Sequence, residues 1–96
     1  MYTSDVMIGI FNELIRLYID KNNVAIIKLD TIFFNIELEL DVDVESWTAA
    51  ALKAYYIDPL NIFELYGRYG WNVIYKELDP KTHTKEPTYT FCPKEK

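Results

Sequence analysis

Between residues 32 and 45 the side chains of this sequence alternate in character at every second position. One set of alternate positions is wholly apolar and runs from Ile32 to Val44. The other set begins with Phe33 and Asn35 and continues with five carboxylates, which are Glu37, Glu39, Asp41, Asp43 and Glu45. A period of two is typical of a strand with one buried face, because successive side chains of a strand point to opposite faces of its sheet. The pattern therefore predicts a long strand over 32–44, with a bend or bulge at some point along it.

The flanking segments predict three helices and three more strands. Apolar residues recur at three- to four-residue spacing in the first helix, Ser46 and Asp58 have short side chains that suit helix caps, and Gly70 suits a left-handed helix stop. We expect helices over 5–22, 47–57 and 59–69, strands over 24–29, 71–78 and 88–92, and a polar hairpin loop over 79–87.

The predicted order is α-β-β-α-α-β-β within a single domain of residues 1–96. Half of the residues are hydrophobic, and 96 residues are enough to bury a core without disulfides or a metal. We expect a small α+β fold, with an antiparallel sheet of three to four strands and helices on one face. The charged tail, residues 93–96, is expected to fray.

The net charge limits the kinds of partner that this chain can bind, and the cysteine content indicates its compartment. A formal net charge of −5 argues against direct nucleic-acid binding, which depends on positive charge. The single cysteine, Cys92, excludes an internal disulfide and favours a reducing, cytoplasmic compartment. We expect no membrane association, because no apolar run approaches the length of a membrane span and the first residues do not resemble a signal peptide.

The sequence contains no pattern that is typical of an enzyme. His83 lies in a polar loop, Cys92 has no basic residue nearby, and no phosphate-binding glycine loop is present. A calcium loop beginning at Asp41 would need glycine where Ser46 stands and glutamate where Leu52 stands. We therefore expect a non-enzymatic protein with no catalytic residue, metal or cofactor.

The uniform sign of the acidic row is the main indication of function. From residue 31 to residue 52 there are five carboxylates and no lysine or arginine. An outer, solvated strand face would account for polar side chains at these positions, but it would not account for charges of one sign. Carboxylates about 6.5–7 Å apart along a strand roughly match the spacing of phosphates on one nucleic-acid strand.

We therefore expect the acidic row to bind a basic protein, with Trp47 as the aromatic anchor. Small size and acidic charge favour an inhibitor or modulator of phage or mobile-element type. Its target would be a nuclease or another nucleic-acid-processing or defence protein of the host, bound by nucleic-acid mimicry.

Two alternatives rest on the aromatic residues. A homodimeric interaction module would use an aromatic patch formed by Phe33, Tyr55, Tyr56, Tyr69 and Trp71. A small-ligand-binding protein would use Glu64 and the rings of Tyr66, Tyr69 and Trp71.

Overall fold

The computed structural model describes residues 3–77 and 87–94 of the chain. The elements are α1 (Thr3–Tyr18), β1 (Ala25–Lys28), α2 (Leu29–Leu40), η1 (Val44–Ser46), α3 (Ala49–Leu52), η2 (Lys53–Ile57), η3 (Asp58–Leu60), α4 (Ile62–Gly67), β2 (Trp71–Lys76) and β3 (Thr88–Pro93). Both η1 and η3 are short 3-10 helices, and η2 is a π-helical turn. The expected α+β class is confirmed.

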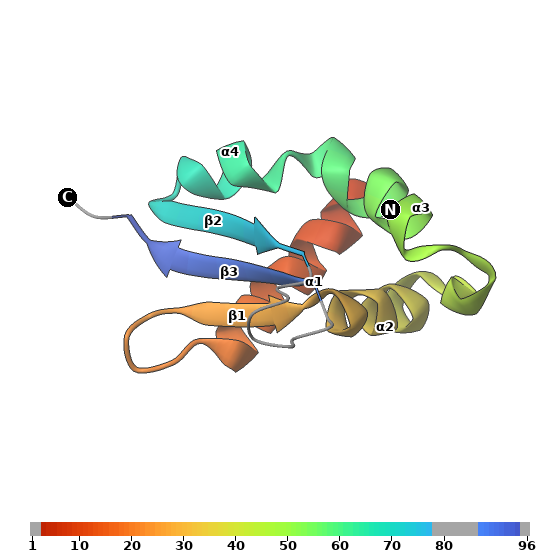
Figure 1. Cartoon of the computed structure of the whole chain (residues 1–96), viewed down its shortest axis with the longest axis horizontal. Coiled ribbons are helices and arrows are strands. Elements are labelled where there is room, and N and C mark those ends of the chain that lie inside the picture. The colour runs from red at the N-terminus through yellow and green to blue at the C-terminus, as the bar shows by residue number, and fades with distance from the viewer. Residues whose placement is uncertain (1–2, 78–86, 95–96) are drawn as a thin grey trace.

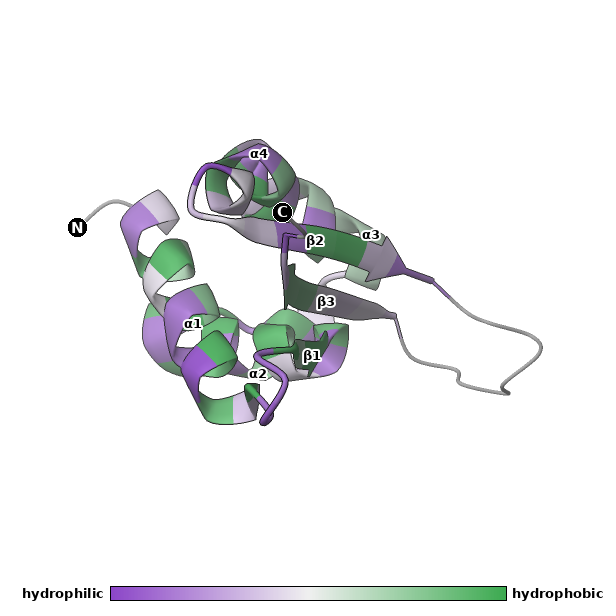
Figure 2. Cartoon of the chain, turned by 90° about the vertical axis from the view of Figure 1, so that its left-hand side faces the viewer, coloured by the Kyte–Doolittle hydropathy of each residue, from purple (hydrophilic) through white to green (hydrophobic). Residues whose placement is uncertain are grey.

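The three strands form an antiparallel sheet in the order β1-β3-β2, so the last strand of the chain lies in the centre (Figure 1). Helix α1 crosses behind this sheet, and Figure 2 shows no described helix on the opposite face. The register places Ala25, Phe91 and Val73 side by side, and all three are buried. In the next row, the side chains of Ile26 and Ile74 are exposed. The helices therefore cover one face of the sheet, as expected.

The core is centred on Phe11 of α1. Its ring lies 6.1 Å from the ring of Tyr89 and 6.0 Å from that of Phe91, both on β3, and 6.5 Å from that of Tyr66 on α4. Phe11, Tyr89 and Phe91 are each 0% exposed. Contacts between aromatic edges and faces add to the free energy of burying their area. This cluster holds α1, β3 and α4 together.

The helical spacing of apolar residues in α1 is confirmed. The buried stripe follows the three- to four-residue spacing and consists of Met7, Ile10, Phe11, Leu14 and Ile15. The helix ends at Tyr18, earlier than expected, because Asp20 forms a turn: its Oδ1 accepts hydrogen bonds from the backbone N–H groups of Asn22 (2.8 Å) and Val24 (3.0 Å).

The strand predicted over 32–44 is wrong, because residues 29–40 form helix α2. Its buried residues, Leu29, Ile32, Phe33 and Ile36, follow the helical spacing, whereas Phe34 and Leu38 are 57% and 62% exposed. Leucine and glutamate, which dominate the second half of this segment, both have high helix propensity. The helix ends at Asp41, whose φ of 54° is a left-handed conformation that aspartate tolerates. The alternation persists only over 40–45, where Leu40, Val42 and Val44 pack against the core.

The segment after α2 differs from the expectation in its details. Thr48, rather than Ser46, caps the next helix, since its Oγ1 accepts a hydrogen bond from the backbone N–H of Ala51 at 3.1 Å. Gly70 adopts the expected left-handed conformation, with a φ of 90°.

At the carboxyl end of the chain, Pro93 completes β3, and the backbone N–H of Lys94 donates to the Gly70 carbonyl at 2.9 Å. The other two residues of the expected tail, and the expected hairpin loop apart from Pro87, lie outside the described residues.

The buried hydroxyl of Tyr89 leads to a stability prediction. Its Oη has no hydrogen-bond partner among the described residues, and a buried polar group without a partner is unfavourable by about 1–3 kcal/mol. We expect Tyr89→Phe to raise the free energy of unfolding in urea by about 1 kcal/mol, because it removes that group and keeps the ring. The matched control is Tyr66→Phe, because the Tyr66 hydroxyl donates to Asn12 Oδ1 at 2.7 Å and its loss should lower stability. Equal destabilisation by both variants would contradict this account of Tyr89.

Candidate functional site

The five predicted carboxylates lie in residues 37–45, here called the acidic segment. Glu37 and Glu39 occupy the last turn of α2, Asp41 is its C-cap, Asp43 precedes η1, and Glu45 lies within η1. All except the half-buried Glu37 are exposed. The segment lies where α2 ends and the chain turns back toward α3, at the right-hand end of Figure 1.

The carboxylates do not form the straight row that the predicted strand would have given. Residues two apart on a helix point in different directions, so Glu37 and Glu39 do not share a face. Only Asp41, Asp43 and Glu45 keep the alternation, with Val42 and Val44 packed inward between them. The regular phosphate-like spacing that motivated nucleic-acid mimicry is therefore absent, although the charges remain concentrated at one end of the molecule.

The acidic segment lies in an electrostatically unfavourable position. The C-terminus of a helix carries a partial negative charge, so carboxylates in the last turn are repelled and basic residues are favoured there. The last turn of α2 contains no basic residue. Within residues 3–77 and 87–94, the ion pairs are Arg16–Glu13, Lys53–Asp58 and Arg68–Glu64, and none involves the acidic segment. The segment therefore has no paired cation in the described part of the chain.

Three predicted aromatic residues gather next to the acidic segment. The Trp47 ring lies 5.5 Å from the ring of Tyr55 and 5.7 Å from that of Tyr56, and the two tyrosine rings are 4.8 Å apart. Tyr56 is buried, and burial raises the pKa of its hydroxyl. Tyr55 is 63% exposed and Trp47 is half-buried. Trp47 follows Glu45 by two residues, so its exposed part and the Tyr55 ring that packs on it lie near the end of the acidic segment.

The remaining members of the predicted aromatic patch lie elsewhere. Phe33 is 6% exposed and belongs to the core, because its segment is a helix and not a strand with an outer face. Tyr69 is 77% exposed and lies beside the half-buried Trp71 at the start of β2. The five aromatic residues therefore do not form one surface.

Tyr69 and Trp71 border two hollows. One, of about 380 Å³, lies between α1 and α4 and is also lined by Asn12 and Tyr66. The other, of about 290 Å³, is lined by Ile19 and Gly70 among others. Burial raises the pKa of Tyr66 to about 12, so its hydroxyl stays protonated and donates to Asn12.

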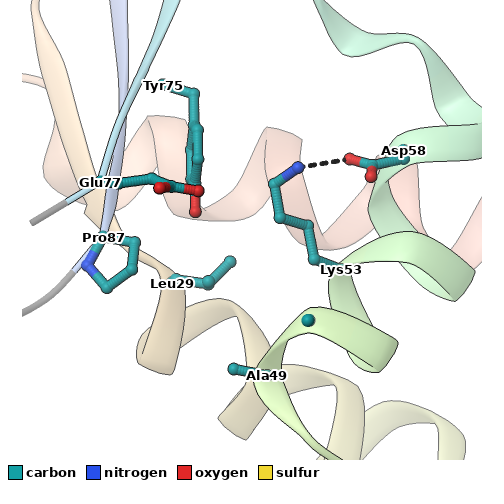
Figure 3. A pocket seen from close by; sticks show the side chains of 8 residues that line it. Leu29, Ala49, Lys53, Asp58, Tyr75, Glu77 and Pro87 are labelled. Atoms are coloured by element: carbon teal, nitrogen blue, oxygen red, sulfur yellow. Dashed lines mark hydrogen bonds and ion pairs between the residues drawn. The ribbon is translucent and has the colours of Figure 1, made fainter.

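A cleft that the sequence did not reveal lies between α3 and the end of β2 (Figure 3). It has a volume of about 400 Å³ and is lined by Leu29, Ala49, Ala50, Lys53, Asp58, Tyr75, Glu77 and Pro87. Lys53 Nζ donates to Asp58 Oδ1 at 2.8 Å and lies 4.8 Å from the centre of the Tyr75 ring. The only sequence feature that hints at this cleft is the five-residue separation of Lys53 and Asp58, which is compatible with an ion pair. That separation does not indicate that Tyr75 lies nearby or that a cleft is present.

The other candidate ligands and nucleophiles do not converge in the described structure. Residues 3–77 and 87–94 contain no group of three histidine, cysteine, aspartate or glutamate side chains that could hold a metal ion. The half-buried thiol of Cys92 lies 3.5 Å from the carbonyl oxygen of Asn72. His83 lies outside the described residues.

Comparisons with known proteins gave no match to a protein-family model, to a curated protein or to a solved structure. In the described part of the chain, no helix has the combination of length and apolar character that crossing a bilayer requires.

The two ends of α2 provide a test of the electrostatic argument. We expect Glu39→Gln to raise the free energy of unfolding by about 0.3–1 kcal/mol at low salt, because it removes a negative charge from the negative end of the helix. The control is Asp30→Asn in the first turn of the same helix, where loss of a negative charge should lower stability. Both effects should shrink at high salt. Urea denaturation measures them, and a stabilising Asp30→Asn or a destabilising Glu39→Gln would contradict the argument.

Proposed function

We propose that this chain is a non-enzymatic protein-binding module and that its acidic segment binds a basic partner protein. The observation that carries the proposal is the concentration of five carboxylates over 37–45, with no ion pair to any of them among the described residues. A basic partner would relieve the repulsion among these charges and the unfavourable interaction with the end of α2. Association with a basic partner would therefore lower the electrostatic free energy of this surface.

The neighbouring aromatic residues give this surface the features of a protein interface. Trp47 and Tyr55 pack against each other and remain partly exposed beside the acidic segment. Tryptophan and tyrosine are enriched among the residues that contribute most to binding energy, whereas complementary charge mainly accelerates association. In the proposed interface, Trp47 and Tyr55 supply the apolar contact, and the carboxylates steer the partner.

The more specific form of the proposal is an inhibitor or modulator of phage or mobile-element type. Its target is a nuclease or another basic, nucleic-acid-processing or defence protein of the host. The support for this form is the small size of the chain and its net charge of −5. An irregular cluster of carboxylates can still occupy a basic groove that otherwise binds phosphates. It would do so through its negative charge, because its spacing does not match that of successive phosphates. We place this action in the cytoplasm, because a chain with a single cysteine, Cys92, has no internal disulfide that an oxidising compartment would preserve.

The test is binding to a panel of basic nucleases and nucleic-acid-binding proteins at low and high salt. We expect Asp41→Asn/Asp43→Asn to weaken binding at low salt by about tenfold, and added salt to weaken wild-type binding strongly. The charge-matched control is Asp20→Asn/Glu64→Gln, which removes two carboxylates outside the acidic segment and should preserve most of the affinity. Binding that responds neither to salt nor to Asp41→Asn/Asp43→Asn would rule out the proposal.

A homodimer is the second candidate, and the exposure of Tyr69 favours it. Tyr69 is 77% exposed between the two hollows that it borders with Trp71, and nearby Ile19 is 38% exposed. An apolar surface of this kind is a common feature of interfaces, and it could equally bind a small apolar ligand.

Sedimentation over a range of concentrations tests the dimer. We expect the wild-type chain to associate as its concentration rises, and Tyr69→Ser to remain monomeric. Phe34→Ser is the matched control, because Phe34 is 57% exposed on α2 and lies outside both hollows. A wild-type chain that stays monomeric at all concentrations would eliminate the dimer.

A further inference from the structure

The cleft in Figure 3 combines an apolar floor with charged residues at its sides. Leu29, Ala49, Ala50 and Pro87 supply apolar surface, and Asp58 and Glu77 supply carboxylates. Figure 3 shows the aromatic ring of Tyr75 beside Glu77, with Lys53 between this ring and Asp58. This combination suits a ligand group with a long apolar stem and a positively charged end, because the stem can cover the floor while the charge meets the carboxylates.

The cleft already accommodates one group of this kind, the side chain of Lys53. Its ammonium lies 2.8 Å from Asp58 Oδ1 and 4.8 Å from the centre of the Tyr75 ring. A cation over the face of a tyrosine is attracted by the negative charge density of the ring. The cleft therefore already places a carboxylate and an aromatic ring around one cationic group.

The second carboxylate of the cleft, on Glu77, is unpaired in the described structure. Glu77 is exposed, and no described residue forms an ion pair with it. Among the described residues that line the cleft, Lys53 is the only basic one, and it is paired with Asp58. The described lining of the cleft therefore carries one more negative than positive charge, and an anionic ligand would meet repulsion from Glu77 and Asp58.

The charge of Glu77 also affects Tyr75, the aromatic residue that lines the cleft. Burial raises the pKa of Tyr75, the Glu77 carboxylate raises it further, and the Lys53 ammonium lowers it. Figure 3 shows the Glu77 side chain next to the Tyr75 ring, on the same side of the cleft.

We propose that the cleft is the socket for an arginine side chain of the basic partner. This inference rests on the proposed function and identifies the contact that would give it specificity. Arginine suits the site better than lysine, because its planar guanidinium can pair with a carboxylate through two hydrogen bonds and can stack on an aromatic ring. The cleft also lies close to the proposed interface along the chain, since its lining residues Ala49 and Ala50 follow Trp47 by two and three residues.

The test uses Nα-acetyl-arginine amide as the probe and its neutral analogue Nα-acetyl-citrulline amide for comparison. We expect the arginine probe to shift the backbone amide resonances of Ala49, Ala50 and Glu77 with saturation at about millimolar concentration. The citrulline probe should bind at least about tenfold more weakly, because it keeps the shape of the side chain and lacks its charge. Equal binding of the two probes, or no saturable shift at these amides, would overturn the proposal.

Two variants and a control localise the binding. Ala50→Trp should fill the cleft and abolish the saturable shifts, and Glu77→Gln should weaken the arginine probe by about tenfold. Ala51→Trp should leave the affinity unchanged, because Ala51 is exposed on the same helix and does not line the cleft. If Ala50→Trp does not fold, Glu77→Gln decides the question by itself, and undiminished binding to a folded Glu77→Gln would contradict the socket.

The failure of this proposal can be distinguished from the failure of the proposed function. If Ala50→Trp and Glu77→Gln bind the basic protein as well as wild type while Asp41→Asn/Asp43→Asn does not, the socket is wrong and the acidic interface stands. If the arginine probe binds the cleft but Asp41→Asn/Asp43→Asn has no effect on the protein partner, the cleft stands and the acidic interface is wrong.

Discussion

The packing of helix α1 against the central strand β3 is the contact on which the rest of the fold depends. Phe11 lies against Tyr89 and Phe91, and these three side chains are fully buried. Strand β3 is also the only strand that pairs with both others among the described residues, so β1 and β2 form no sheet without it. The chain therefore joins an element near its beginning to one near its end. The helices α2, α3 and α4, which carry the candidate sites, are placed around that contact.

Much of this fold could be predicted from local patterns, and the main error shows where such patterns fail. The apolar stripe of α1, the strands and the left-handed Gly70 follow from spacing and residue type. Residues 29–40 are hydrophobic at so many positions that both a strand period and a helix period fit. Phe33 distinguishes the two, because it falls on the polar side of a strand but on the buried stripe of a helix. The cleft could not be predicted, because Leu29, Lys53, Tyr75 and Pro87 become neighbours only in the tertiary structure.

The change from strand to helix alters the physical meaning of the acidic residues. On a strand they would form a regular row, and polarity on the outer face would explain most of their presence. At the end of α2 they face the negative end of the helix, with no basic residue in its last turn. The long-range field of these charges and the nearby cleft have complementary roles in the proposed interface. In this proposal the field attracts a basic protein from a distance, and the cleft selects one side chain of that protein at contact.

The conformation of residues 29–40 is the central claim, because the electrostatic argument and the position of the acidic segment both depend on it. The most direct measurement is the set of Cα and Cβ chemical shifts of these residues in solution, together with contacts between Hα and the Hβ three residues later. A helix gives downfield Cα shifts and these three-residue contacts from Leu29 to Leu40, with a break at Asp41. Upfield Cα shifts and contacts between neighbouring strands over 32–44 would contradict the claim, and the five carboxylates would then lie along one strand face.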